Sequence, residues 1–579
     1  MSRLIHSNNM GVSINSADFW KQFEGGLDSL EQTQPYLWLS KTLEDPSQVE
    51  PVQEAVAKSM VISYQSLSKP GEIEALITGM NGGFIKAGSG GDPLKNPSTT
   101  SGTNLFGFDP AKVPSSQAYN AAEKELQNLL DAHLAENGQY PKKIAFSLWA
   151  GETQRHFGML EAQVLRALGL KPVWDRGGNL QRLEIIPTAD LTHPRIDVVI
   201  QATSVYRDQF DGFMLKLSHA IEQLSQLDDG NAIAKNSQNL SDKLRDLGYS
   251  SERASMLSAL RIFSNEPGDY GSGVNHLAVQ SQDWEDDDAL GKQFTHRLQY
   301  AYGTQVWGEK LGDTNLFESQ LASVDAAVMT RTSRLHGLLS TDHPFEYLGG
   351  LAAAVRRASG QDPSLYINDL RESNSRTVSA GKFIAEELNA RYMNPVWIKA
   401  MQKEGYAGAL NMLDITNNLF GWQATAPETV GDYQWEALSE VYIDDKHDLG
   451  INEWFEQHQP AAQMQIIERM LEAVRKGYWE ADEARLKALL ERHQQLESMV
   501  DYHQTHNVTA EFIEQTATGF GLSGMAGQAP TISGNVMQEI PAYEEPSMSD
   551  KKMLFLIIII FVCMAFGAVR QHFIYRDLK

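Results

Sequence analysis

Two apolar segments, each followed directly by a cluster of polar residues, most constrain what this chain can fold into. The segments are Ile144–Trp149 and Ile196–Ala202. Continuous apolar runs of this length are typical of parallel strands that are buried on both faces of a sheet. The polar clusters are Gly151–His156 and Tyr206–Asp208. Because open α/β sheets bind ligands beyond the carboxyl ends of their strands, the sequence predicts a functional site at these clusters.

The charge and the cysteine content restrict the partners and the kind of site. The 579 residues include 49 basic and 74 acidic side chains, which gives a formal net charge of −25. Such a surface argues against nucleic acid or an anionic membrane surface as a broad partner. The single cysteine, Cys563, excludes a disulfide framework and a cysteine zinc site within one chain.

An uncharged apolar run near the C-terminus, residues 553–569, lies between Lys552 and Arg570. Its length is at the short end for a membrane-spanning helix, and flanking cations can reach the lipid headgroups. We therefore predict a transmembrane helix over 553–569, preceded by a flexible linker over 501–552 and followed by a short basic tail over 570–579. The predicted location is the inner (cytoplasmic) membrane with a single pass. The excess of basic residues after the helix favours a periplasmic body, with a cytoplasmic body as the alternative.

The hydrophobic periodicity predicts a multi-domain protein of class α/β and α. A helical and loop segment over 1–80 precedes a Gly-rich loop and a Rossmann-like α/β unit over 81–205, and a large, mainly helical region follows over 206–500. In the α/β unit we expect these elements: strands 142–149, 171–174, 182–186 and 196–202, and a helix over 153–169. In the helical region we expect these: an amphipathic helix Ser250–Phe263, an apolar run Ala322–Met329 with strand character, and a short strand Ser364–Ile367.

A series of short motifs resembles one protein family in composition and in order. The motifs lie at residues 81–93, 104–110, 148–155, 168–175, 194–198, 206–210, 261–273, 348–371, 391–409, 419–425 and 470–479. They are similar to blocks of the large subunit of cobaltochelatase, the H subunit of magnesium chelatase and membrane-bound chelatase-like proteins of haem use. No single block is specific, but their ordered set over roughly 70–500 is.

The chain departs from that family's pattern in two ways. Large subunits of the family are more than twice as long and carry an upstream His-Gly-Thr-x-Glu element, which is absent here. The chain therefore resembles the C-terminal half of such a subunit. Leu348 stands where cobaltochelatase subunits tend to have a histidine before Gly-Gly. Together with the predicted membrane helix, this leucine is more similar to the membrane-anchored, haem-linked branch.

Glu152 and His156 are the first candidates for catalysis. They are one helical turn apart at a predicted helix start, so they share a face. A chelatase must hold a borderline divalent metal and take protons from pyrrole nitrogens, and carboxylate and imidazole groups can do both near neutral pH. The alternative is that Glu152 caps the helix and His156 lies on a solvated face.

Other candidates lie at or near the predicted strand ends. Asp369 follows the predicted strand 364–367, and we predict a catalytic role or, alternatively, a helix cap. Arg207, Asp208 and His336 are predicted to bind substrate, because an arginine can hold the carboxylate side chains of a tetrapyrrole. The alternatives are a structural ion pair for Arg207 and Asp208, and a packed or surface histidine in a helix for His336. The metal ligands are left unassigned.

Three further patterns give weaker indications. The run Gly88–Asp92 can bind an anion through its backbone but lacks the ending of a nucleotide-binding P-loop. The run Glu285–Asp288 can bind a cation or form a solvated acidic loop. His503 and His506 have metal-ligand spacing without a third ligand nearby.

The resemblance implies a cobaltochelatase-type subunit that binds a tetrapyrrole and takes part in metal insertion, with cobalt as the expected metal, in corrinoid (cobalamin) biosynthesis. It implies a tetrapyrrole substrate, a divalent ion of cobalt, magnesium or iron, and ATP used only by partner subunits. The implied partners are AAA+ chelatase subunits or a separate polypeptide with the N-terminal half. The alternatives are a membrane-anchored haem dechelatase in iron acquisition and a non-catalytic tetrapyrrole-binding scaffold.

Overall fold

An eight-stranded sheet forms around the two apolar segments. The computed structural model describes residues 71–86, 88–89, 102, 104–105, 108–286, 288–311, 314–371, 374–500, 508–520 and 522. The strand order is β12-β11-β10-β3-β6-β7-β8-β9, and the five strands from β11 to β7 run parallel, while β12, β8 and β9 pair antiparallel. The strands are β3 (Lys143–Leu148), β6 (Asp197–Ala202), β7 (Ile262–Ser264), β8 (Tyr300–Tyr302), β9 (Trp307–Glu309), β10 (Ala326–Arg331), β11 (Ser364–Asp369) and β12 (Arg376–Ser379).

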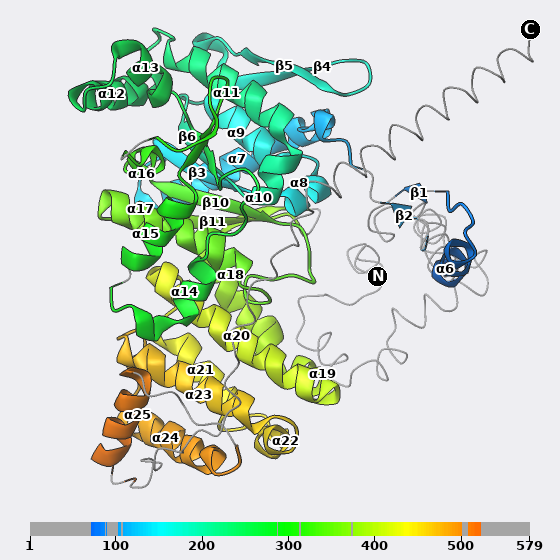
Figure 1. Ribbon diagram of the computed structural model, residues 1–579, viewed down its shortest axis with the longest axis vertical. Helices are drawn as coiled ribbons and strands as arrows, with labels where there is room; N and C mark the ends of the chain where they lie inside the picture. The colour runs from blue at the N-terminus through cyan, green and yellow to red at the C-terminus, as the bar shows by residue number, and fades with distance from the viewer. Residues whose placement is uncertain are drawn as a thin grey trace, which may run out of the picture. The chain divides into compact units, whose positions relative to one another are not determined.

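The predicted apolar segments are the central pair β3 and β6, and every residue of both strands is buried. Alternate residues enter two different cores, because side chains of a strand point to opposite faces. Ile144 and Phe146 belong to a core with α7 (Ser116–Asn137) and α9 (Met159–Leu168). Ala145 belongs to a second core that continues into the C-terminal helices. The sheet is therefore covered by helices on both faces (Figure 1).

The remaining helices of the α/β part surround the sheet or follow its strands. They are α8 (Ala150–His156), α10 (Ser204–Gln209), α11 (Asp211–Ser225), α12 (Ala232–Asp246), α13 (Ser251–Ser258), α14 (Val274–Val279), α15 (Asp288–Arg297), α16 (Leu316–Leu321), the π-helix Phe345–Gly349, α17 (Gly350–Ser359), α18 (Ala380–Glu387) and the π-helix Leu388–Tyr392.

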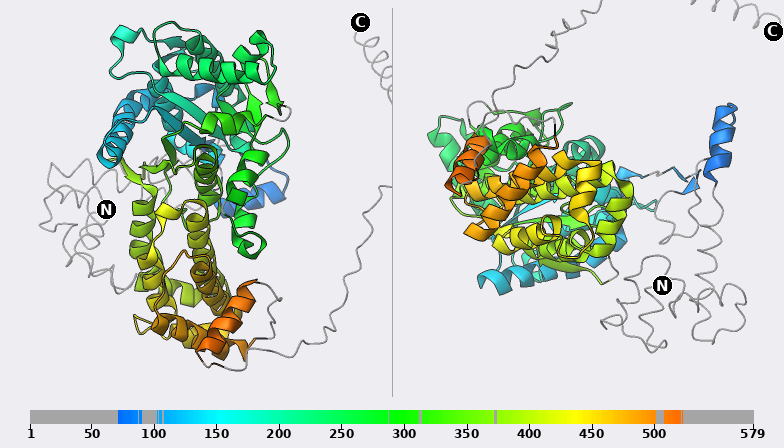
Figure 2. Two further views of the ribbon diagram at one scale, coloured as in Figure 1. Left: turned by 90° about the vertical axis from the view of Figure 1, so that its left-hand side faces the viewer. Right: turned by 90° about the horizontal axis from the view of Figure 1, so that it is seen from below.

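The C-terminal helices pack on one another around α20 and α23. Their apolar faces share one continuous core with the second face of the sheet. Figure 2 shows these helices gathered together, in yellow-green to orange. They are α19 (Pro395–Glu404), α20 (Tyr406–Thr425), α21 (Asp432–Tyr442), α22 (Ile451–His458), α23 (Pro460–Arg475), α24 (Glu483–Glu497) and α25 (Val508–Gly519). Upstream, α6 (Glu72–Met80) and the parallel pair β1 (Gly88–Ser89) and β2 (Asn104–Leu105) are described.

The helix predicted over 153–169 is divided in two. α8 ends at His156, and Phe157 and Gly158 both have left-handed backbone, with φ of 54° and 83°. A Cβ on Gly158 would lie 2.7 Å from the Cα of Pro114, so the close approach there requires glycine. The chain turns at this point and restarts as α9.

Two other predicted elements differ from the structure. The predicted strands 171–174 and 182–186 are an antiparallel pair of their own, β4 (Leu170–Trp174) and β5 (Leu180–Ile185), and do not enter the main sheet. The amphipathic helix predicted over Ser250–Phe263 ends at Ser258, and the chain then forms β7. Short apolar stretches of a few residues do not distinguish a helix end from a short buried strand.

The fold-class prediction is wrong in two respects. The region predicted as mainly helical, 206–500, supplies six strands of the main sheet, β7 to β12, so the described chain is mixed α/β with a large helical content. The predicted transmembrane helix is also not supported. Within the described ranges, no helix has the length and apolar character needed to span a bilayer. The apolar run 553–569 itself lies outside them. That prediction rested on apolar composition, and apolar composition alone does not determine whether a segment forms a helix.

Candidate functional site

The chain order of the sheet reverses between β3 and β10. From β3 the chain builds outward through β6 and β7, and it later returns to the other side of β3 with β10 and β11. Such a switch point leaves a crevice beyond the carboxyl strand ends, where α/β proteins bind ligands. Trp149 and Glu152 follow β3, and Arg331 and Thr332 stand at the end of β10. This sheet edge is therefore the candidate site.

Glu152 joins the two sides of the switch point. Its Oε1 accepts from Arg155 Nη2 at 2.7 Å and lies 3.6 Å from Arg331 Nη1, and its Oε2 accepts from Thr332 Oγ1 at 2.5 Å. Burial raises the pKa of Glu152, but the two arginines and Thr332 lower it more, so this pKa lies below its usual value. The carboxylate stays charged and fixes the end of β10 to the start of α8.

His156 is buried and contacts the turn between α8 and α9. Its Nδ1 accepts from the backbone N–H of Met159 at 2.9 Å, and burial lowers the pKa of His156 to about 4. The imidazole is therefore neutral at pH 7 and caps α9. It shares α8 with Glu152, as predicted from the spacing, but the two side chains do not share a hydrogen bond in the described contacts.

Arg207 and Asp208 hold the loop that follows β7. Arg207 Nε donates to Asp208 Oδ1 at 2.7 Å, and Asp208 also accepts from the hydroxyl of Tyr270 at 2.8 Å. Arg207 Nη1 donates to three backbone carbonyls, those of Asn265 at 3.1 Å, Glu266 at 2.6 Å and Asp269 at 3.2 Å. Arg207 Nη2 is buried without a hydrogen-bond partner among the described residues. The pair links β6 to the loop after β7, at the same edge as Glu152.

Asp369 ends β11 and is engaged by two arginines. Its carboxylate accepts from Arg371 Nε at 2.6 Å and Nη2 at 2.8 Å, and from Arg376 Nε at 3.2 Å. Burial raises the pKa of Asp369, but the hydrogen bonds from Arg371 and the nearby charges lower it more. The residue therefore stays ionised and joins β11 to β12. The helix that follows is capped by Ser379 and not by Asp369, and the catalytic role of Asp369 stays a prediction.

His336 is exposed in the loop after β10. This agrees with the alternative of a surface histidine, except that the residue lies in a loop and not in a helix. The ends of this loop are anchored, because Arg331 Nη2 donates to the carbonyl of Gly337 at 3.2 Å and Glu387 accepts from the N–H of Leu338 at 2.7 Å. His336 therefore lies at the candidate edge beside the exposed Leu335. The catalytic and binding roles assigned from sequence remain predictions.

Sequence reasoning missed a histidine and a glutamate at this edge. His343 Nδ1 lies 3.0 Å from Glu346 Oε2, and Glu346 Oε1 accepts from the N–H and hydroxyl of Ser272 at 2.7 Å and 3.0 Å. Glu346 belongs to the π-helix Phe345–Gly349, an irregularity that is frequent at functional sites. The His-x-x-Glu spacing was the available signal, but only the fold brings Ser272 to it.

Aromatic and apolar side chains accompany these polar groups. Trp149 is half-buried, and its ring stands edge-on to Tyr347, with centroids 5.3 Å apart, and to His343, at 6.4 Å. Exposed apolar residues lie on segments that follow parallel strands, namely Phe157, Val205, Tyr270 and Leu335. The edge thus combines a buried ionic network with exposed apolar side chains.

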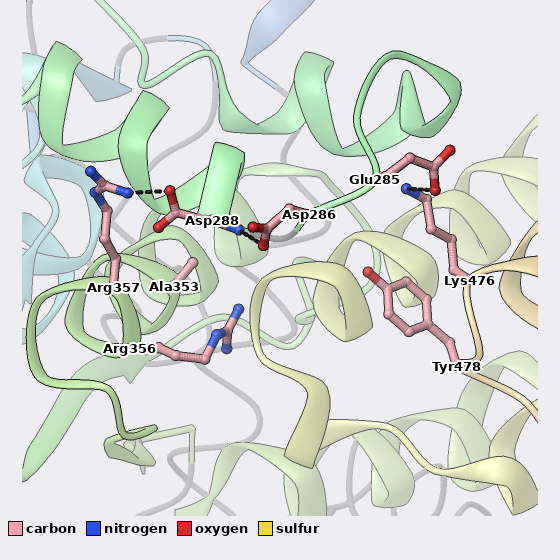
Figure 3. A pocket seen from close by; sticks show the side chains of 8 residues that line it. All are labelled: Glu285, Asp286, Asp288, Ala353, Arg356, Arg357, Lys476 and Tyr478. Atoms are coloured by element: carbon pink, nitrogen blue, oxygen red, sulfur yellow. Dashed lines mark hydrogen bonds and ion pairs between the residues drawn. The ribbon is translucent and has the colours of Figure 1, made fainter.

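The other weak patterns do not make a metal site in the described chain. The carboxylates of the acidic loop form ion pairs with basic side chains. Glu285 pairs with Arg475 and Lys476, and Asp288 pairs with Arg357. Figure 3 shows this loop facing Arg356 across a pocket of about 650 Å³. Residues 90–92 of the Gly-rich run lie outside the described residues, as do both histidines of the 503–506 pair. Among residues that are described, no three His, Cys, Asp or Glu side chains gather as metal ligands.

The comparisons with known proteins agree with the motif order. The CobN/Magnesium Chelatase family model matches residues 23–486. An uncharacterized protein of Methanocaldococcus jannaschii is 30% identical over 77% of this chain and 36% of its own length. The magnesium-chelatase subunit ChlH of Oryza sativa subsp. japonica is 30% identical over 74% of this chain and 31% of its own. The aerobic cobaltochelatase subunit CobN of Sinorhizobium sp. is 29% identical over 72% and 32%.

A solved structure supports the same assignment. The catalytic subunit of cobaltochelatase from Mycobacterium tuberculosis superposes with a TM-score of 0.73 at 30% identity, covering 81% of this chain and 40% of that one. The chain spans about a third of the length of the curated relatives that it matches. By sequence and by fold, the chain belongs to the CobN/magnesium chelatase family.

Proposed function

We propose that this chain binds a tetrapyrrole at the carboxyl edge of its sheet and takes part in inserting a divalent metal, cobalt, into a corrinoid. The observation that carries the proposal is the fold shared with a cobaltochelatase catalytic subunit at 30% identity. Both cobaltochelatase and magnesium-chelatase subunits are relatives at similar identity. The proposal therefore chooses cobalt over magnesium, and a metal-insertion assay tests this choice.

The groups at the edge suit the peripheral carboxylates and the flat face of a tetrapyrrole. Arg155 is partly exposed and already oriented, since its Nη2 donates to Glu152 and its Nε to Thr332 at 2.8 Å. A guanidinium held in this way can bind a carboxylate at little entropic cost. Trp149 and Leu335 offer apolar contact to the ring beside it. Glu152 contributes by fixing Arg155 and Arg331.

Partner subunits are a second part of the proposal. The sequence contains no P-loop, so ATP would be used by AAA+ partner subunits. A separate polypeptide that carries the N-terminal half of a large subunit is the alternative partner in this proposal.

A non-catalytic tetrapyrrole-binding scaffold is the second candidate. It is favoured by the engagement of two carboxylates that were predicted to be catalytic, because Glu152 and Asp369 are both held by arginines. A scaffold would bind the ring and leave metal insertion to groups on its partner.

Titration of the full chain with a metal-free corrinoid, a metal-free porphyrin and haem, followed by absorbance, tests binding. Addition of Co²⁺, Mg²⁺ or Fe²⁺ with the AAA+ subunits and ATP then tests insertion. We expect corrinoid binding in the micromolar range or tighter and a spectral change with Co²⁺. Binding without insertion favours the scaffold, whereas preference for haem or insertion of Mg²⁺ contradicts the choice of cobalt. Lack of binding to all three rings contradicts the proposal.

The variant Arg155→Ala tests the location. We expect it to weaken corrinoid binding by about tenfold, the loss of one charge-assisted contact. Arg182→Ala, which removes an exposed arginine of β5 outside the main sheet, is the matched control. Equal effects of the two variants would place the ring elsewhere.

A further inference from the structure

The pair His343 and Glu346 has the geometry of a histidine oriented by a carboxylate. Glu346 is fixed on both oxygens, because Oε1 accepts two hydrogen bonds from Ser272 and Oε2 faces His343 Nδ1 at 3.0 Å. Its side chain is only 3% exposed, whereas that of His343 is 58% exposed. A carboxylate at Nδ1 favours the tautomer with the proton on Nδ1, which leaves the Nε2 lone pair available.

The support of Glu346 comes from a distant part of the chain. Ser272 lies between Gly271 and Gly273, which both have positive φ, of 75° and 73°. A Cβ on Gly271 would lie 3.4 Å from Glu346 Oε1, so the loop approaches the carboxylate closely. Gln293 Nε2 also donates to the carbonyl of Ser272 at 3.1 Å. The orientation of His343 is thus set by the loop after β7 and not by its own helix alone.

The environment of His343 places it beside the candidate ring site. Trp149, which follows β3 at the switch point, stands edge-on to the imidazole. The charged groups that face His343 are Asp342 and Glu346 of its own segment, Arg331 at the end of β10 and, beyond Asp342, Asp414 of α20. The hydrogen bond to Glu346 is the main reason that the pKa of His343 is raised above 6.5, and Arg331 acts against it.

We infer that His343 is the proton acceptor that deprotonates the pyrrole nitrogens of the bound ring, with Glu346 and Ser272 as positioning residues. This inference rests on the proposed function. In each step the N–H bond of one pyrrole breaks and its proton moves to His343 Nε2. The electron pair stays on the pyrrole nitrogen, where it forms the bond to the incoming divalent metal. The exposed imidazolium then returns the proton to solvent, and the step repeats for the second N–H.

The role of proton acceptor fits the pair better than that of metal ligand. A stable protein site for a divalent transition metal needs three or more ligands, and within the described residues His343, Glu346 and the neighbouring Asp342 are not arranged as such a group. A general base needs only one free lone pair and a pKa near the working pH. A single imidazole that is oriented through Nδ1 and largely exposed can meet that requirement.

The first test measures the histidine itself, without turnover. Deuterium exchange at the imidazole C2 position, followed by mass spectrometry over a pH series, gives the pKa of each histidine in the full chain. We expect His343 to titrate above 6.5 in the wild type and lower in Glu346→Gln, because glutamine keeps the size but not the charge. His219, exposed on α11, is the control, and its C2 exchange rate should be the same in both proteins. An unchanged His343 pKa would remove Glu346 from the positioning role.

The second test compares binding and insertion. His343→Ala should bind the metal-free corrinoid like the wild type but insert metal at least about 100-fold more slowly. Glu346→Gln should slow insertion by about tenfold and move the acidic limb of the pH–rate profile to lower pH. His219→Ala should match the wild type. Because His343 is exposed, its truncation should not unfold the chain, and circular dichroism checks this.

The outcomes separate the two proposals. If the corrinoid binds and His343→Ala inserts metal at the wild-type rate with an unchanged pH profile, the inference is overturned and the proposed function stands. If no tetrapyrrole binds to the wild type, the proposed function fails, and the role of His343 fails with it.

Discussion

The central sheet differs between the amino and the carboxyl ends of its parallel strands, which we call its amino and carboxyl edges. The two differ in whether their charged groups keep contact with solvent. At the amino edge, Asp197 pairs with Arg261, with Nε and Nη2 at 3.0 Å and 3.2 Å, and lies 3.7 Å from Lys143 Nζ. All three groups are buried, and burial lowers the pKa of Lys143 to about 7. At the carboxyl edge, Arg155 and His343 keep one side open to solvent. We therefore interpret a fully buried ion pair as structural. A charged side chain that is held in place but partly exposed is the better candidate for a functional site.

The strongest test of this comparison is Asp197→Asn at the amino edge. The variant leaves Lys143 and Arg261 buried without their counter-charge. We expect a loss of about 3–5 kcal/mol in the free energy of unfolding, measured with urea, and unchanged corrinoid affinity of the folded fraction. The exposed Asp242 of α12 provides the control, since Asp242→Asn should change stability by less than about 0.5 kcal/mol. A small effect of Asp197→Asn would mean that the network is not structural.

His156 provides a test of pH dependence at the carboxyl edge. The pKa of His156 is lowered from 6.5 to about 4, so its stabilising effect is complete above pH 6.5 and is lost as the pH falls toward 4. The full difference corresponds to about 3 kcal/mol. Unfolding of the wild type and His156→Gln at pH 7, 6 and 5 should show the wild type losing more stability on acidification. Parallel pH profiles would contradict the buried, neutral imidazole.

Glu152→Gln is the carboxyl-edge counterpart of Asp197→Asn. We expect a smaller loss, about 1–3 kcal/mol, because Arg155 can turn to solvent and Arg331 keeps the carbonyl of Gly337. Corrinoid binding should weaken in the same variant, unlike in Asp197→Asn. Urea unfolding and absorbance titration measure the two effects. Loss of stability with full binding would make this edge as purely structural as the other.

The smallest effect is expected from the charge beside His343. Because the hydrogen bond to Glu346 raises the pKa of His343, its stabilising effect is present below pH 6.5 and is lost as the pH rises through the raised value. The wild type should exceed Glu346→Gln in this contribution by about 0.5 kcal/mol or less, since the imidazole is largely exposed. The stability difference between the two proteins should be greater at pH 6 than at pH 8.5. Equal differences would mean that the pair is not charged.

The sequence predicted the centre of the fold better than its periphery. Long apolar runs predicted β3 and β6, and the apolar residues of 364–367 predicted most of β11. Strands of three residues, such as β7, have too few positions to show a period, and each was missed or absorbed into a helix. For the same reason the sequence did not show that β7, β8 and β9 extend the sheet.

For the candidate site, the sequence located Glu152 and Arg207 at strand ends and offered the ion pair of Arg207 with Asp208, but it did not reveal their more distant partners. Thr332 lies 180 residues after Glu152 and still donates to it. Arg207 donates hydrogen bonds to the backbone carbonyls of Asn265, Glu266 and Asp269, and a side-chain motif cannot reveal such contacts. The sequence thus favoured free catalytic groups where the structure records engaged ones.

The sequence by itself determined the family, the parallel centre of the sheet and the edge at which polar groups gather. These depend on local apolar runs and on motifs in a fixed order, which are properties of the chain itself. Only the tertiary structure decided which of those groups are engaged in ion pairs and hydrogen bonds and which are exposed to solvent. It paired Glu152 with Arg331, neutralised His156 by burial, and brought Ser272 to Glu346 to orient His343. The physical reason is that charge, burial and hydrogen bonding are set by neighbours in space, and those neighbours come from strands far apart in the chain.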